Sequence, residues 1–108
     1  MDSLLKLRDE IKTFVEERDW DQFHSPANLA KSISIESAEL LECFQWDDEK
    51  FDKEAAVEEL ADVMNYCIQM GIALNVDLKT IIENKMAKNA KKYPVEKCRG
   101  VSTKYDKL

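Results

Sequence analysis

Residues that interrupt helices are scarce in this chain of 108 residues, which contains only two glycines and two prolines. Glycine and proline are the strongest local breaks in a chain, so their scarcity leaves room for long, uninterrupted helices. Strand-like alternation of polar and apolar residues is absent, and apolar residues recur instead at helical spacing. The sequence therefore predicts an all-α domain.

Two further absences bear on where the protein works. No apolar run reaches the ~18 residues that a membrane-spanning helix needs, and residues 1–6 lack the apolar stretch of a signal peptide. We therefore expect a cytoplasmic protein with no membrane partner. The three cysteines, Cys43, Cys67 and Cys98, form no C-x-x-C pair, so a cysteine-based zinc site is not expected.

An excess of basic residues is also lacking, because the formal net charge is −6. Duplex nucleic acid is therefore not an expected partner, since affinity for it comes largely from lysine and arginine on phosphates. A small polyanion can still bind if metal ions lie between the acids and the phosphates. The mix of 44% apolar and 35% charged residues indicates a soluble globular protein, and a domain of this size often completes its core by oligomerising.

Apolar spacing and helix-stop signals divide the chain into four predicted helices. They cover residues 3–18, 26 to about 46, 53–74 and 78–92, with loops at 19–24 and 47–52. Ser25 and Asp77 are suited to cap the second and fourth helices, and Pro94 ends the fourth because the residue before a proline is pushed out of the α region. We predict a four-helix bundle over residues 1–96, completed by oligomerisation, and a polar, mobile tail over 97–108.

Two glutamates lie where the helical pattern calls for apolar side chains. Glu36 falls in the middle of the apolar face of the second helix, and Glu59 lies among residues of the third helix that favour burial. A charge in such a place is costly unless something compensates it. A buried salt bridge to a lysine or arginine is the ordinary explanation, and a bound cation is the alternative.

Each of these glutamates has an acidic neighbour three residues along its helix. Residues at i and i+3 are neighbours, so Glu36 with Glu39, and Glu59 with Asp62, each project two carboxylates to nearly one point. Asp62 alone would pass as a solvated surface residue. Two such helices packed antiparallel bring four carboxylates together, and that much negative charge needs divalent cations. Oxygen ligands alone indicate a hard ion, Mg²⁺ or Mn²⁺.

Cations lie on the inward face of the fourth predicted helix. Lys85, Asn89 and Lys92 continue its apolar stripe, and a lysine on an inward face is normally paired. Its partner is either the acid cluster or a phosphate chain that metal ions bridge to the acids, since phosphoryl chemistry commonly combines metal ions with lysine or arginine.

Several aromatic residues lie outside the apolar stripes. Trp20, Phe23 and His24 are in the first predicted loop, and Trp46 is at the end of the second helix. They either cover the end of the bundle or form walls that stack on a nucleobase.

Short motifs follow one another in a distinctive order along residues 14–94. They are ERDWDQFH at 17–24, ESAE at 36–39, FQW at 44–46, EELAD at 58–62, and KM at 85–86 followed by Asn89 and KYP at 92–94. Together they resemble the MazG-like all-α NTP pyrophosphohydrolases. The first and third strings are similar to those of the dCTP pyrophosphatase branch of that family.

The resemblance implies a MazG-like four-helix fold that assembles as a homodimer or homotetramer with sites at subunit contacts. It implies Mg²⁺-dependent hydrolysis of a dNTP, dCTP or a modified dCTP, to the monophosphate and pyrophosphate, as in sanitation of the nucleotide pool. By matching positions it assigns the metal to Glu36, Glu39, Glu59 and Asp62, the base and sugar to Trp20, His24, Trp46 and Tyr66, and the phosphates to Lys85, Asn89, Lys92 and Tyr93. The short acidic loop at 47–52 departs from relatives with a longer insertion and leaves the base preference open.

Our mechanistic hypothesis is that water, activated by a metal or by Glu36 or Glu39, attacks the α-phosphorus. Two rivals stay open. One is a non-enzymatic interaction protein whose acids pair with Lys85 and Lys92. The other is a related phosphohydrolase that acts on dUTP or another nucleotide.

Overall fold

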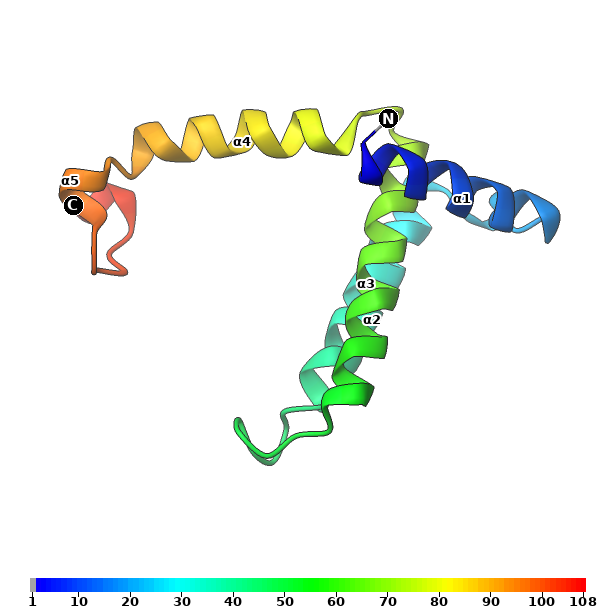
Figure 1. Cartoon of the computed structure of the whole chain (residues 1–108), viewed down its shortest axis with the longest axis horizontal. Helices are drawn as coiled ribbons and strands as arrows, with labels where there is room; N and C mark the ends of the chain where they lie inside the picture. The colour runs from blue at the N-terminus through cyan, green and yellow to red at the C-terminus, as the bar shows by residue number, and fades with distance from the viewer. Residues whose placement is uncertain (1) are drawn as a thin grey trace. The chain divides into compact units, whose positions relative to one another are not determined.

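The computed structural model describes residues 2–108, and every regular element in that range is helical. The chain divides into two compact units, one ending at Val76 and the other spanning Asp77–Leu108. The first contains α1 (Ser3–Glu17), a 3₁₀ turn (Asp21–Phe23), α2 (Pro26–Glu42) and α3 (Lys53–Ala73); the second contains α4 (Leu78–Lys92), α5 (Val95–Cys98) and a 3₁₀ turn (Tyr105–Lys107) (Figure 1). The all-α prediction and the four long helices are confirmed.

Each long helix begins at a side chain that caps its first turn. The capping oxygens belong to Asp2, Ser25, Asp52 and Asp77, and they accept hydrogen bonds from the backbone N–H three residues later at 2.8, 3.1, 3.2 and 3.1 Å. Such a cap satisfies one of the N–H groups that a helix end leaves unpaired. The predicted starts at Ser25 and Asp77 are therefore confirmed.

Two helices end on a residue in the left-handed conformation, Asp19 after α1 (φ 53°) and Asn75 after α3 (φ 54°). After α1 the N–H of Trp20 donates to the carbonyl of Val15 at 3.1 Å, as in a Schellman motif. Asp and Asn enter this conformation more readily than most other residues with a side chain. The turn carries Trp20 back along α1, where its ring lies 6.0 Å from that of Phe14, centroid to centroid.

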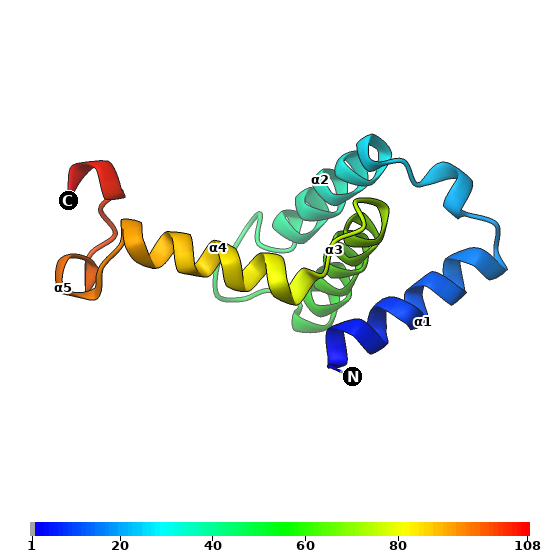
Figure 2. The same cartoon turned by 90° about the horizontal axis from the view of Figure 1, so that it is seen from above.

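The first unit is built on an antiparallel pair of helices. α2 lies along α3, and the connection at residues 43–52 is short enough to return the chain directly (Figure 2). α1 packs against α3. The buried apolar side chains are Ile11, Val15, Leu29, Ala56 and Ile68. This core is small, which agrees with the expectation for a chain of this size.

α2 is shorter than predicted: it ends at Glu42, whereas the sequence predicted an end near residue 46. The N–H groups of Cys43, Phe44 and Gln45 bond to carbonyls three residues back, which is the tighter 3₁₀ pattern in which helices often end. The ring of Phe44 lies 4.4 Å from that of Phe51. This aromatic contact joins the two ends of the loop between α2 and α3.

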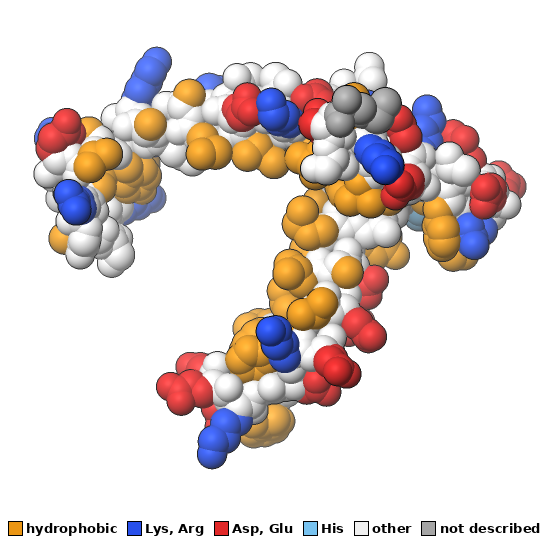
Figure 3. Space-filling view, in the orientation of Figure 1, with side chains coloured by type: hydrophobic (Ala, Val, Ile, Leu, Met, Phe, Trp, Pro, Cys, Tyr) orange, Lys and Arg blue, Asp and Glu red, His pale blue; other side chains and the backbone are white. Residues whose placement is uncertain are grey.

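One apolar face of α3 is only partly covered. Val57, Leu60 and Met64 are 53%, 50% and 47% exposed, whereas Ile68 further along is 1% exposed. Figure 3 shows the hydrophobic side chains (orange) that line one side of α3. Exposed apolar patches of this kind mark protein contacts. Completion of the bundle by oligomerisation stays a prediction, and this face is consistent with it.

The second unit also presents an exposed apolar stripe. Ile81, Ile82 and Met86 of α4 are 42%, 51% and 64% exposed. Over residues 2–108, none of the helices combines the length and the apolar composition needed to span a bilayer.

The C-terminal segment has local structure of its own. The ring of Tyr105 lies edge-on to Tyr93 at 6.0 Å between centroids, and the Lys92 ammonium lies 4.8 Å from the Tyr105 ring centroid. Residues after α4 therefore fold back on the end of that helix. The predicted boundary at residue 96 and the mobility of the tail stay predictions, although α5 (Val95–Cys98) crosses that boundary.

Candidate active site

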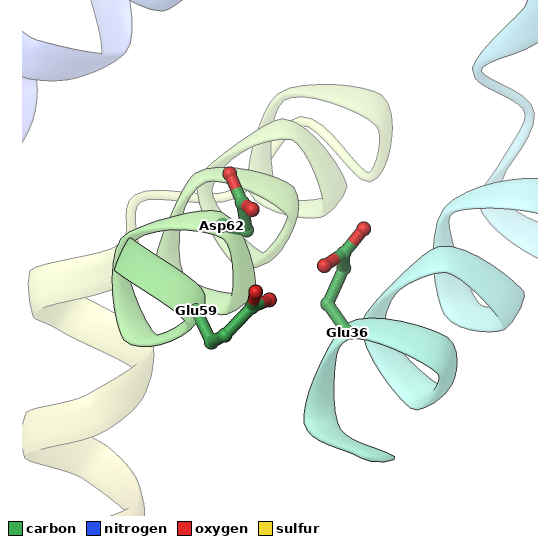
Figure 4. A group of neighbouring side chains, drawn as sticks. All are labelled: Glu36, Glu59 and Asp62. Atoms are coloured by element: carbon green, nitrogen blue, oxygen red, sulfur yellow. The ribbon is translucent and has the colours of Figure 1, made fainter. Parts of the chain in front are cut away.

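Three carboxylates converge between α2 and α3. Glu36 comes from α2, Glu59 and Asp62 come from α3, and one oxygen of each lies within 4.8 Å of the others (Figure 4). The antiparallel pairing places the middle of α2 against the middle of α3. Two acids that are one turn apart on α3 therefore meet the acid on α2.

The raised pKa values of two of these acids reflect the cost of ionising the cluster. The pKa of Glu36 is raised from its ordinary value of 4.5 to about 7, first by a hydrogen bond with Glu39, then by burial and by the charges of its acidic neighbours. The pKa of Glu59 is raised mainly by burial and then by the hydrogen bond and charge of Glu39. Glu39 itself is exposed. Glu39 and Asp62 each raise the pKa of both Glu36 and Glu59. All four predicted acids are therefore electrostatically linked.

Two oxygens of the cluster have no partner. Glu36 Oε2 and Glu59 Oε2 are buried and accept no hydrogen bond from the described residues. No lysine or arginine within residues 2–76 forms a salt bridge with any of the four acids. Within that unit the salt-bridge explanation for Glu36 therefore finds no support.

Unpartnered carboxylate oxygens at this spacing fit a hard divalent cation. Mg²⁺ and Mn²⁺ favour oxygen ligands, and a cation would relieve both the repulsion and the missing partners. Glu36, Glu59 and Asp62 would be its ligands, with Glu39 beside them.

A pocket of about 240 Å³ opens next to the acids. Its walls are Phe14, Val15, Trp20, His24, Asp62, Asn65, Tyr66 and Gln69. The rings of His24 and Tyr66 meet edge-on at 6.5 Å between centroids. Asp62 belongs to both the pocket and the acid cluster. The structure thus brings three of the predicted base-binding residues, Trp20, His24 and Tyr66, next to the predicted metal ligands.

Local hydrogen bonds hold the loop that carries these aromatic residues. Nε2 of Gln22 donates to the carboxylate of Asp19 at 3.0 Å and to its carbonyl at 2.9 Å. Nδ2 of Asn28, in the first turn of α2, donates to the carbonyl of Phe23 at 3.0 Å. The loop is therefore tied to itself and to α2, which positions Trp20 and His24 before any ligand binds.

Sequence reasoning missed four residues of this pocket: Phe14, Val15, Asn65 and Gln69. Phe14 and Val15 follow the helical spacing of apolar residues in the first helix, a pattern that predicts burial and not a ligand contact. Asn65 and Gln69 are ordinary polar side chains on a helix, and their residue types alone do not indicate a site. The signal was nevertheless in the spacing, because Asp62, Asn65 and Gln69 lie at i, i+3 and i+7 and so share one helix face.

Trp46 lies away from this pocket. It is 89% exposed and follows the C-terminal end of α2, whereas His24 precedes the N-terminal end of that helix. The 17 residues of α2 separate them by ~25 Å at 1.5 Å per residue. Its predicted contact with the base is therefore not made within one chain and stays a prediction.

The four predicted phosphate-binding residues belong to the second unit. Lys85, Asn89 and Lys92 lie on α4, and Tyr93 is its C-terminal cap. All four are exposed, so the first unit's pocket is formed without them. Their contact with phosphates stays a prediction.

Comparisons with known proteins agree with these features. The MazG-like family matches residues 31–108. The proteins named dCTP pyrophosphatase 1 from Rattus norvegicus and Homo sapiens are 38% and 36% identical over 104 residues, covering 88% of this chain and 61% of each relative. The chain thus spans about 61% of the length of these curated relatives.

Solved structures show the same likeness. The chain is similar to a pyrophosphatase from Archaeoglobus fulgidus DSM 4304, with a TM-score of 0.81 and 39% identity over 87% of this chain and 94% of that one. The resemblance that the motifs indicated is confirmed, and the chain belongs to the MazG-like family.

Proposed function

We propose that this chain is a Mg²⁺-dependent nucleoside triphosphate pyrophosphohydrolase that cleaves a dNTP, most readily dCTP or a modified dCTP, to dNMP and pyrophosphate. The observation that carries the proposal is the acid cluster with unpartnered oxygens that shares Asp62 with an aromatic pocket. The cluster suits cations and phosphates, and the pocket suits a base. Relatives named dCTP pyrophosphatase 1 and a pyrophosphatase of the same fold support it.

In this proposal the acids would hold the metal, and one of them would accept the proton of the attacking water. Glu36, Glu39, Glu59 and Asp62 would bind Mg²⁺, which neutralises the triphosphate and the leaving pyrophosphate when bound. Water attacks the α-phosphorus, the bond from this phosphorus to the bridging oxygen breaks, and pyrophosphate leaves with that oxygen. Glu36 or Glu39 accepts the proton of the attacking water.

Aromatic rings hold the base. Trp20, His24 and Tyr66 line the pocket beside Asp62, and stacking on such rings is worth ~1–3 kcal/mol per base. Trp46 reaches a base only from another copy of the chain, which supports a homodimer or homotetramer with sites at subunit contacts. The exposed apolar face of α3 offers a surface for that contact.

The phosphate chain needs positive charge. The predicted phosphate-binding residues are Lys85, Asn89, Lys92 and Tyr93, and the first two lie one helical turn apart on α4. Lysine and metal ions together commonly stabilise the charge that develops in phosphoryl transfer.

A panel of dNTPs with Mg²⁺, analysed by chromatography of the products, tests the chemistry directly. We expect dNMP and pyrophosphate in equal amounts, with dCTP turned over fastest. Release of inorganic phosphate and dNDP would identify a different bond cleavage. Preference for dUTP would move the chain to the rival branch.

Glu39→Gln tests the acids, with Glu42→Gln as its matched control on the same helix. Glu42 is exposed and lies outside the acid cluster. Glu39→Gln should lose most of its turnover with dCTP and still melt as a folded protein, while Glu42→Gln should keep its activity. Full activity in Glu39→Gln would contradict the catalytic assignment.

Thermal melting separates the enzyme from a non-enzymatic interaction protein. Mg²⁺ with a non-hydrolysable dCTP analogue should raise the melting temperature of the wild type, because a ligand that binds the folded state stabilises it. An interaction protein whose acids pair with lysines should show no such rise.

A further inference from the structure

Two amide side chains on α3 line the pocket but have no role in the function proposed above. Asn65 and Gln69 are one helical turn apart, so their side chains are neighbours. Nε2 of Gln69 donates a hydrogen bond to Oδ1 of Asn65 at 2.7 Å. Both residues line the pocket that contains Asp62.

This hydrogen bond leaves Gln69 with an acceptor that has no partner. Oε1 of Gln69 is buried and receives no hydrogen bond from residues 2–108. An amide oxygen accepts hydrogen bonds and cannot donate them. Buried polar groups are normally paired, and an exception calls for an explanation. A ligand that donates a hydrogen bond at this point would supply the missing partner.

The size of the pocket favours part of a nucleotide as that ligand. Its volume of about 240 Å³ is below the ~300–1,000 Å³ of pockets that hold whole drug-sized molecules. Gln69 lies seven residues beyond Asp62 on the same face of α3, ~10 Å along the helix axis. The acids therefore mark the phosphate end of the site, and the amides mark the base end.

We propose that Gln69, held by Asn65, is a specificity-determining residue that accepts a hydrogen bond from the exocyclic amino group of the base. The inference rests on the proposed function. Cytosine carries an amino donor where thymine, and likewise uracil, carries a carbonyl oxygen. A carbonyl oxygen at that position would face Oε1 of Gln69, and two acceptors cannot form a hydrogen bond with each other. Rotation of the Gln69 amide to present its NH₂ group requires Asn65 to turn as well, since their mutual hydrogen bond would otherwise be lost.

Substitutions at Gln69 test this assignment through the ratio of kcat/KM for dCTP to kcat/KM for dUTP. Wild type should prefer dCTP. Gln69→Met keeps the length of the side chain without an acceptor and should lower the ratio roughly 2- to 13-fold, the effect of one neutral hydrogen bond. Gln69→Glu retains an acceptor and should keep the preference for dCTP. The control is Lys31→Met, because Lys31 is exposed on α2 and lies outside the pocket; its ratio should equal that of wild type.

Asn65 is a positioning residue in this scheme. Asn65→Ala frees the Gln69 amide to rotate, so dUTP should gain relative to dCTP while kcat for dCTP changes little. The change in the ratio distinguishes positioning from a structural role, because a loosened helix would slow both substrates alike.

The outcomes separate the inference from the function on which it rests. Wild-type hydrolysis of dCTP with an unchanged ratio in folded Gln69→Met overturns the role of Gln69 and leaves the proposed function standing. Equal kcat/KM for dCTP and dUTP in wild type also overturns it. A wild-type protein that hydrolyses no dNTP overturns the proposed function itself. Melting curves establish that Gln69→Met is folded; if it is not, an unchanged ratio in Asn65→Ala overturns the scheme.

Discussion

Acidification should weaken Mg²⁺ binding, because the metal needs ionised carboxylates and Glu36 holds its proton near neutral pH. The pKa of Glu36 in the metal-free protein is about 7. A group with that pKa is about one-eleventh ionised at pH 6 and ten-elevenths ionised at pH 8, so the apparent Kd for Mg²⁺ should be roughly tenfold weaker at pH 6. The raised pKa of Glu59 acts in the same direction. The two groups interact, so the transition belongs to the cluster as a whole.

The raised pKa of Glu36 also contributes to the stability of the metal-free protein, and this contribution depends on pH in the opposite sense. The folded pKa of Glu36 lies above its ordinary value of 4.5, so the folded state binds the proton more tightly than the unfolded state. This contribution to stability is fully present below pH 4.5 and is lost as the pH rises through about 7. The metal-free melting temperature should fall over this window, and saturating Mg²⁺ should reduce the fall.

Calorimetric titration of Mg²⁺ at pH 6, 7 and 8, with melting curves in a chelator, measures both effects. Glu36→Gln removes the titrating group, so its metal-free stability should vary less between pH 5 and 7 than that of wild type. Glu42→Gln, on the same helix but outside the cluster, should behave as wild type. The same Kd for Mg²⁺ at pH 6 and pH 8 in wild type would refute the reasoning.

Three further predictions concern the fold and its assembly. Leu29 is 1% exposed, so Leu29→Ala should lower the free energy of unfolding by about 2–5 kcal/mol, as measured by urea denaturation. Leu41→Ala, at a site that is 71% exposed, should lower it much less. Asp52→Ala removes the cap of α3 and should cost ~1 kcal/mol, whereas a similar loss in Asp48→Ala would show that the effect is not the cap. Leu60→Glu charges the exposed face of α3, so light scattering should report a smaller assembly than for wild type, and an unchanged mass would exclude this face as the contact.

Helix positions were predictable because their signals are local. Ser25 and Asp77 cap helices from within three residues, and Asn75 ends α3 through its own backbone conformation. The end of α2 was less predictable. Its last turn tightens into 3₁₀ geometry while Phe44 contacts Phe51, a contact that depends on where the loop returns.

The pocket was harder to predict than the acids. Trp20 and His24 were noticeable because they are aromatic residues outside the apolar stripes, whereas Gln69 looked like an ordinary polar side chain. Only the packing of α1 and the first loop against α3 gives Asn65 and Gln69 a wall of aromatic neighbours. Trp46 shows the converse, since its motif pointed to the base although α2 keeps it away from this pocket.

By itself the sequence determined the all-α class, the four long helices and the acids Glu36 and Glu59, because periodicity and a misplaced charge are properties of single helices. Tertiary structure decided which side chains meet. The antiparallel pairing of α2 and α3 brings Glu36 to Glu59 and Asp62 and leaves two of their oxygens without partners. Through Asp62 the cluster is joined to the pocket that Gln69 also lines. Such contacts depend on how helices from distant parts of the chain pack. A local sequence pattern carries no information on the distance between residues of two different helices.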